Sequence, residues 1–93
     1  MPWSELDSLR AAMDVLNRRL VDVLHERARL CRRIAHCKLA SGRPAADPAR
    51  EQAMLQALLS VPAGEGFPPE SLALILRTVF AESRQLVERS TGC

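Results

Sequence analysis

The fold is decided by residues 5–41, which read ELDSLRAAMDVLNRRLVDVLHERARLCRRIAHCKLAS. Apolar side chains recur along this segment in alternating steps of three and four residues, which is the spacing of one face of a long helix that packs against other helices. We call this row the seam, and it consists of Leu6, Leu9, Met13, Leu16, Leu20, Val23, Arg27, Leu30 and Ile34. Every member is apolar except Arg27.

Arg27 needs an anionic partner. A guanidinium group cannot be deprotonated in a protein, and burying it alone is very costly. The partner is either a carboxylate of the protein or a bound ligand. Lys38 follows eleven residues later, and eleven residues return a helix to within about 20° of the same face, about 16 Å along its axis. Two long cationic side chains that lean toward each other leave room for one small anionic molecule.

Length and charge limit the classes of protein that this chain can represent. The chain has 93 residues, of which 47% are hydrophobic and 3% aromatic, so we expect one small domain, residues 1–93, with an aliphatic core. A net charge of +2 does not indicate nucleic-acid binding. The basic residues between Arg27 and Arg50 form either a solvated helix face or a site for a small polyanion.

The cysteines and the lengths of the apolar runs indicate the cellular compartment of the protein. Cys31, Cys37 and Cys93 show no metal-ligand spacing, and we interpret them as reduced thiols of a cytoplasmic protein. No apolar run approaches the ~18 residues of a transmembrane helix. We therefore predict neither a metal site nor a membrane association.

The helix signals predict an all-α chain of three helices, at about residues 5–41, 47–60 and 69–90. Ser4 begins the first helix and Gly42 ends it, and the pair Asp47-Pro48 begins the second. The first helix would be roughly 50 Å long, longer than a compact chain of this size is wide. We expect a second copy of the chain to cover it.

Four further polar residues belong to the candidate site. Arg10 lies 17 residues before Arg27, roughly 25 Å along the helix, so it is either a surface arginine or a contribution from a second, antiparallel subunit. Glu51 follows Arg50 in the first turn of the second helix, where it is either a partner of the helix dipole or an acceptor for a substrate hydroxyl. Ser83 is the polar member of the apolar row of the third helix.

Together these residues resemble the all-helical class of chorismate mutase over roughly residues 6–88. The resemblance is carried by Arg10, Arg27, Lys38, the Asp47-x-x-Arg50-Glu51 start of the second helix, and Glu82-Ser83-Arg84-x-Leu86. It implies an intertwined all-α homodimer that needs no cofactor. It also implies an isomerase that rearranges chorismate to prephenate in aromatic amino-acid biosynthesis, through the shikimate pathway.

The resemblance further implies a role for each site residue. Arg27, together with Arg10 of the partner subunit, would bind the substrate carboxylates, and Lys38 would donate a hydrogen bond to the breaking ether oxygen. Glu51 and the backbone near Asp47 would hold the ring hydroxyl. The remaining carboxylate contacts would come from Arg50 and Ser83.

Val87 departs from the family pattern, because this position usually carries Gln or Glu as a second donor to the ether oxygen. Three interpretations compete: an intrinsically weak enzyme that a partner enzyme activates, an enzyme for a related substrate, or a shift of the third helix that brings Glu88 into the site.

Three other functions remain open from the sequence. An isochorismate pyruvate-lyase has the same fold but lacks a Glu directly after the arginine, so Arg50-Glu51 favours the mutase. An amino-chorismate mutase is not separated by these motifs. A non-catalytic helical module that binds protein or RNA would not explain an arginine in the seam.

Overall fold

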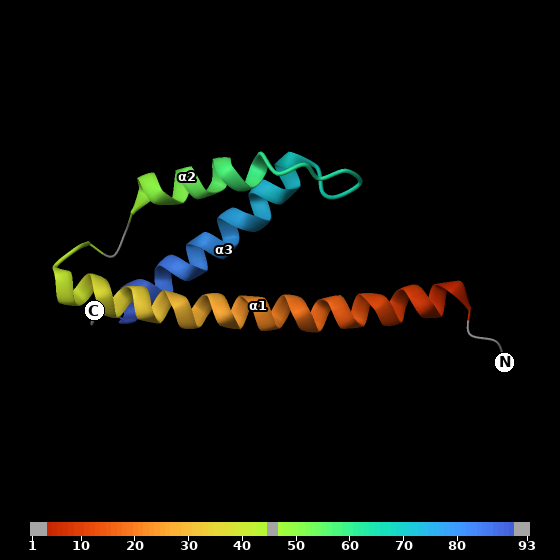
Figure 1. The fold of residues 1–93 in the computed structure, drawn as a ribbon, viewed down its shortest axis with the longest axis horizontal. Helices are drawn as coiled ribbons and strands as arrows, with labels where there is room; N and C mark the ends of the chain where they lie inside the picture. The colour runs from red at the N-terminus through yellow and green to blue at the C-terminus, as the bar shows by residue number, and fades with distance from the viewer. Residues whose placement is uncertain (1–3, 45–46, 91–93) are drawn as a thin grey trace.

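The computed structural model describes residues 4–44 and 47–90, which form the three helices that the sequence predicts. They are α1 (Glu5–Ser41), α2 (Pro48–Leu59) and α3 (Pro69–Ser90) (Figure 1). The described residues contain no strand, so the all-α class is confirmed. None of these helices combines the length and apolarity needed to cross a bilayer. Cys93, which the sequence analysis interprets as a reduced thiol, lies outside the described residues.

The ends of the first two helices follow the expected capping signals. The Ser4 hydroxyl accepts a hydrogen bond from the Asp7 amide at 3.0 Å at the start of α1. Gly42 ends α1 in the left-handed conformation with φ 73°, and its amide donates to the Lys38 carbonyl. The Asp47 carboxylate accepts from the Arg50 amide at 3.1 Å at the start of α2. The caps satisfy backbone groups that a helix end leaves without intrahelical partners.

The three helices are arranged around α3. α2 runs back above α1, and α3 descends from the loop after α2 to the C-terminal half of α1 (Figure 1). In the described part of the chain α3 packs against both α1 and α2, whereas those two helices do not pack against each other. The relative placement of α1 and α2 therefore depends on α3.

The core consists of two small clusters. One contains Cys31 and Ala35 of α1 with Val87 of α3. The other contains Leu55 of α2, Ala73 and Phe80 of α3, and partly buried residues around them. Cys31 and Cys37 are free thiols. Two separate clusters of this size leave most of the apolar surface of the chain outside a closed core.

The seam of α1 is largely uncovered within one chain. Its apolar members keep between 47% and 60% of their surface exposed, and α1 itself buries Cys31 and Ala35. The molecule measures 61 × 27 × 16 Å, so the N-terminal half of α1 extends beyond the other two helices (Figure 1). Coiled-coil spacing thus predicted the helix correctly, but not which of its residues this chain buries.

Substitution of Gly42 tests the end of α1. Apart from Gly42 and its two chain neighbours, no described atom lies within 4 Å of a Cβ built at this position, so the cost of a side chain there comes from the backbone conformation. We expect Gly42→Val to lower the free energy of unfolding by about 1–2 kcal/mol, and Gly42→Asn by less, because Asn tolerates the left-handed region. Urea denaturation followed by circular dichroism, at one fixed protein concentration, measures both. Equal losses for Val and Asn would contradict this explanation.

Candidate functional site

A cavity of about 410 Å³ opens between the three helices, beside both core clusters. This volume is in the range of small-molecule sites. Its walls combine apolar side chains with charged ones from all three helices. The lining residues are Arg27, Leu30, Cys31, Ile34, Lys38, Asp47, Arg50, Glu51, Met54, Phe80, Ser83, Arg84 and Val87. Seven of the eight residues that the sequence assigned to a site line this one cavity, and Arg10 does not.

One face of α3 forms a continuous wall of the cavity. Phe80, Ser83, Arg84 and Val87 all line it, and their spacing of three, one and three residues places them on a single helical stripe. Phe80 and Val87 are buried, and they anchor the two ends of the stripe in the two core clusters. Ser83 and Arg84, between them, carry the polar groups.

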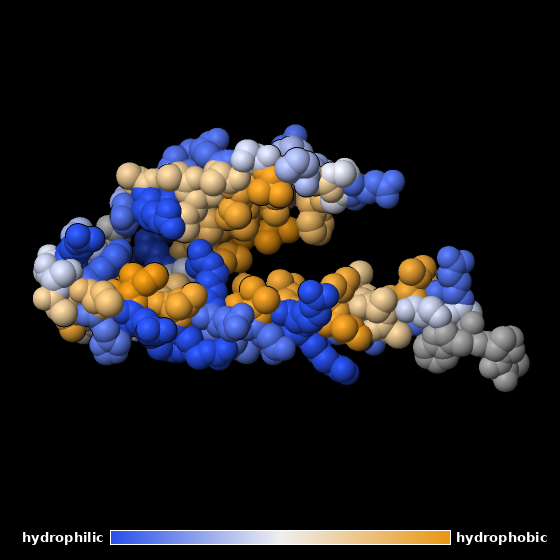
Figure 2. All heavy atoms as spheres, in the orientation of Figure 1, coloured by the Kyte–Doolittle hydropathy of each residue, from blue (hydrophilic) through white to orange (hydrophobic). Residues whose placement is uncertain are grey.

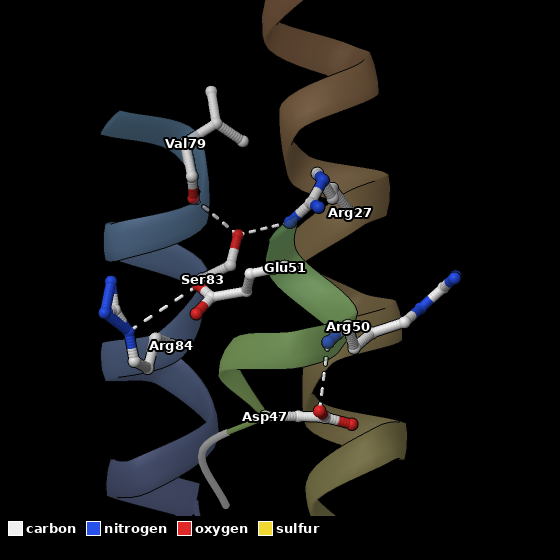
Figure 3. A network of polar contacts seen from close by, with 7 residues as sticks. All are labelled: Arg27, Asp47, Arg50, Glu51, Val79, Ser83 and Arg84. Atoms are coloured by element: carbon white, nitrogen blue, oxygen red, sulfur yellow. Dashed lines mark hydrogen bonds and ion pairs between the residues drawn. The ribbon is translucent and has the colours of Figure 1, made fainter. Parts of the chain in front are cut away.

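Arg27 is held by a hydroxyl and an aromatic ring. Its guanidinium donates a hydrogen bond to the Ser83 hydroxyl, which in turn donates to the Val79 carbonyl at 2.7 Å (Figure 3). The guanidinium carbon also lies 5.2 Å from the centroid of the Phe80 ring, within the range of a cation–π contact. These contacts fix the orientation of the side chain before any ligand binds.

Neither of these contacts neutralises the charge of Arg27. Among residues 4–44 and 47–90, no carboxylate forms an ion pair with it. The interpretation that Arg27 pairs with an acidic residue of its own chain is therefore wrong for the described residues. A half-buried guanidinium without an anion favours an anionic ligand in the adjoining cavity.

Lys38 supplies a second cation to the same cavity. It lies in the last turn of α1 and is half-buried. The sequence placed Lys38 and Arg27 on a shared face, and both line the cavity. The two cations thus border one space from the same helix, and charge-assisted hydrogen bonds from such groups favour a small molecule that carries carboxylates.

The start of α2 forms the opposite rim. One oxygen of the Asp47 carboxylate caps the helix by accepting from the Arg50 amide, and Asp47 also lines the cavity. Glu51 is half-buried, and one carboxylate oxygen lies 3.6 Å from Arg84 Nε. Arg50 is exposed, and its side chain extends away from Ser83 and Arg84 in Figure 3. Arg50 thus borders the cavity, but its guanidinium must turn toward Ser83 to reach a ligand held by Arg27.

Val87 lines the cavity as a buried residue with 7% of its surface exposed. It packs against Cys31 and Ala35. Glu88 is exposed and does not line the cavity. A shift of α3 that puts Glu88 in place of Val87, one of the three interpretations of this position, is therefore not present in this structure. The wall near Val87 is apolar.

Arg10 is exposed in the part of α1 that extends away from the other helices. It is not in the cavity of its own chain. This placement agrees with the distance estimated from the sequence, and only a second subunit could bring such a residue to the site.

Phe80 and Arg84 of α3 line the cavity, although neither had a role in the site predicted from the sequence. Arg84 belongs to the motif Glu82-Ser83-Arg84-x-Leu86 that carries the family resemblance, and Phe80 has no part in that motif. Helical spacing could have identified both residues, because Phe80 lies three positions before Ser83 and Arg84 lies three positions before Val87, on the same face of the helix. What could not be read from spacing was that this stripe faces Arg27 and Glu51.

Comparisons with known proteins agree on one family. The sequence model of the family described as chorismate mutase type II matches residues 9–88. The T-protein of Enterobacter agglomerans is 32% identical over 80 residues, which cover 86% of this chain and 21% of that protein. The chain thus spans about a fifth of the length of this curated relative.

Two solved structures are similar over nearly their whole length. Chorismate mutase (form II) of Thermus thermophilus has a TM-score of 0.87 and 34% identity, and the match covers 92% of this chain and 97% of that one. Form I of the same enzyme has a TM-score of 0.82 and 32% identity, with 86% of this chain and 99% of that one covered.

Replacement of Arg27 by leucine separates stability from ligand binding. Leucine continues the seam, and no ion pair with a described carboxylate is lost. We expect Arg27→Leu to leave the free energy of unfolding unchanged or to raise it by up to about 1 kcal/mol. Binding of a small dicarboxylate should weaken at least about tenfold. Denaturation curves and calorimetric titration measure the two effects.

Arg29→Leu is the matched control, because Arg29 is exposed on α1 and does not line the cavity. It should leave dicarboxylate binding unchanged. A loss of several kcal/mol of stability in Arg27→Leu would contradict this assignment and make Arg27 a structural residue.

Proposed function

The chain belongs to the chorismate mutase type II family, and from this premise we propose that it rearranges chorismate to prephenate. The observation that carries the proposal is the cavity in which Arg27 and Lys38 of one helix lie beside Glu51 and Ser83 of the other two. A substrate with two carboxylates, an ether oxygen and one hydroxyl offers a partner to each of these groups.

The chemistry of the reaction suits such a site. Chorismate becomes prephenate by an intramolecular Claisen rearrangement, in which the ether carbon–oxygen bond breaks while a carbon–carbon bond forms. No group of the enzyme has to attack the substrate or take its proton. Catalysis comes from holding the folded, reactive conformer and from stabilising the negative charge that develops on the ether oxygen. Fixed cations and hydrogen-bond donors perform both tasks.

Arg27 and Lys38 take the central roles in this proposal. Arg27 binds a substrate carboxylate, and its orientation is set in advance by Ser83 and Phe80. Lys38 donates a hydrogen bond to the ether oxygen as that bond breaks. A donor that is already in place where charge develops costs no reorganisation at the moment of reaction.

The groups of α2 and α3 hold the rest of the substrate. Glu51 accepts a hydrogen bond from the ring hydroxyl, which the backbone near Asp47 also contacts. Ser83 and Arg50 complete the carboxylate contacts: the Ser83 hydroxyl turns its proton from the Val79 carbonyl to the substrate, and the exposed Arg50 side chain turns toward Ser83. The half-buried position of Glu51 on the cavity wall supports its role.

A homodimer completes the site in this proposal. The apolar side of the N-terminal half of α1 faces the apolar side of α2 and α3 across an open hollow (Figure 2). A second, antiparallel α1 would fill that hollow, cover the exposed seam and bring Arg10 to the partner's cavity. Two equivalent sites follow from the two-fold symmetry, each with Arg10 donated across the interface.

The apolar wall at Val87 makes the site weak for its reaction. Loss of one donor to a developing negative charge typically costs about 10²–10³ in rate. We propose that Lys38 supplies the protein's hydrogen bond to the ether oxygen in the absence of the second donor, and that a partner enzyme raises the activity.

The free thiols of Cys31 and Cys37 support a cytoplasmic location. Formation of prephenate places the reaction in aromatic amino-acid biosynthesis.

Replacement of Val87 tests both the proposed reaction and the effect of the missing hydrogen-bond donor at this position. We expect the wild-type protein to convert chorismate to prephenate, measured by the loss of chorismate absorbance with identification of the product. Val87→Gln should raise kcat at least about tenfold by restoring a donor. Lys38→Ala should abolish the reaction. Val87→Leu, which keeps the wall apolar, is the control and should give no gain.

An inert wild type alongside an active Val87→Gln variant would refute chorismate as the natural substrate. If both were inert, the proposed activity would be wrong. An equal gain in Val87→Gln and Val87→Leu would mean that volume rather than hydrogen bonding limits this site.

Mixing two inactive variants tests the donation of Arg10. Arg10→Ala and Arg27→Ala should each be inactive alone. After the two are unfolded together and refolded, half of the dimers combine one chain of each kind, and each mixed dimer has one intact site. We therefore expect the mixture to recover about a quarter of the wild-type activity. No recovery, with both variants folded and dimeric, would show that Arg10 acts within its own chain, and an active Arg10→Ala variant would show that it has no role.

A further inference from the structure

The first turn of α2 carries site residues but lies beyond the packed part of that helix. Leu55 is the buried residue of α2, and Met54 and Leu59 pack beside it against α3. Glu51 lies one turn before Leu55, outside this cluster. In the described part of the chain α2 does not pack against α1. The apolar packing therefore holds the C-terminal part of α2, whereas the turn that bears Glu51 needs another contact to hold it.

Arg84 provides that contact. Its Nε lies 3.6 Å from an oxygen of the Glu51 carboxylate, and the two side chains keep 39% and 26% of their surfaces exposed. The Nε atom is shielded from solvent and makes no hydrogen bond within the described residues. The donor is thus shielded but slightly too far from the carboxylate for a hydrogen bond, and hydrogen bonds of unliganded active sites are often long and tighten when a ligand binds.

Two adjacent residues of α3 thus reach toward two different helices. Ser83 receives the hydrogen bond from Arg27 of α1, and Arg84 pairs with Glu51 of α2 (Figure 3). Successive residues of a helix point about 100° apart, so this divergence follows from the helix itself. Neighbouring positions of α3 thus contact both Arg27, the proposed carboxylate-binding residue, and Glu51, the proposed hydroxyl-binding residue.

We infer that Arg84 is a positioning residue, which aims the Glu51 carboxylate at the hydroxyl of the substrate ring and so gives the site its preference for hydroxylated dicarboxylates. This inference rests on the proposed function, since it assumes the hydroxyl contact of Glu51. A guanidinium suits the task because its planar set of donors fixes the orientation of a carboxylate, which the point charge of a lysine does not. Arg84 acts through Glu51 and not on the reacting bond.

Binding of two unreactive ligands tests this role without relying on turnover. The first is the lactyl ether of the chorismate ring, in which the enol double bond is reduced so that no rearrangement occurs. The second is the same dicarboxylate without the ring hydroxyl. We expect Arg84→Gln to weaken the hydroxylated ligand about tenfold, and the deoxy ligand less than twofold. Calorimetric titration gives both dissociation constants.

Three comparisons test whether Arg84 affects the ligand preference through Glu51. Arg77→Gln removes an exposed arginine of the same helix that does not line the cavity, and it should change neither constant. Glu51→Gln should lose the preference for the hydroxyl. Addition of Arg84→Gln to that variant should then have no further effect on the preference, because the two residues act as one unit. If Arg84→Gln does not fold, Arg84→Lys is measured in its place, with the same expected loss of preference.

Equal weakening of both ligands in Arg84→Gln would overturn the inference, since it would show that Arg84 acts as a general cation for the carboxylates. Unchanged binding of both ligands would overturn it as well. Either result would leave the proposed function standing, provided that the wild type binds the two dicarboxylates. If the wild type binds neither ligand and does not rearrange chorismate, the proposed function fails, and this inference fails with it.

Discussion

The contact between α3 and Arg27 is the interaction on which the site depends. α1 and α2 do not pack against each other in the described chain, so α3 alone sets the distance between the two walls of the cavity. The guanidinium is placed by the Ser83 hydroxyl and the Phe80 ring, and both belong to the α3 face that closes the cavity. The stripe of α3 therefore packs in both core clusters and orients Arg27. It also contacts Glu51 on the opposite wall.

The electrostatics of the cavity explain why a polar residue persists in an apolar seam. A protein that needed only stability would place leucine at position 27, because a half-buried charge without an anion is unfavourable. Arg27 instead contacts a neutral hydroxyl and a ring, which orient it while leaving its charge for a ligand. In the proposed function, binding of an anion would recover the stability lost at this position, which is the exchange of stability for function seen at many binding sites.

The shape of the single chain has a functional consequence. A helix of 37 residues projects from a molecule of 61 × 27 × 16 Å and keeps its apolar row exposed. Exposed apolar surface of this extent marks an interaction site. The proposed second copy would remove this surface from water and would also deliver Arg10, so that stability and completion of the site would come from one assembly step.

The amino-acid sequence was sufficient to predict the three helices, their ends and most of the residues around the cavity. These features are local, since periodicity and capping residues such as Ser4, Gly42 and Asp47 act over a few positions, and the eleven-residue spacing of Arg27 and Lys38 is fixed by helix geometry. The packed structure was needed to show that Arg27 meets Ser83 and Phe80 rather than a carboxylate, that Arg84 faces Glu51, and that Val87 rather than Glu88 lines the cavity. These outcomes depend on how α3 is rotated and crossed against the other helices, which is set by packing between residues far apart in the chain.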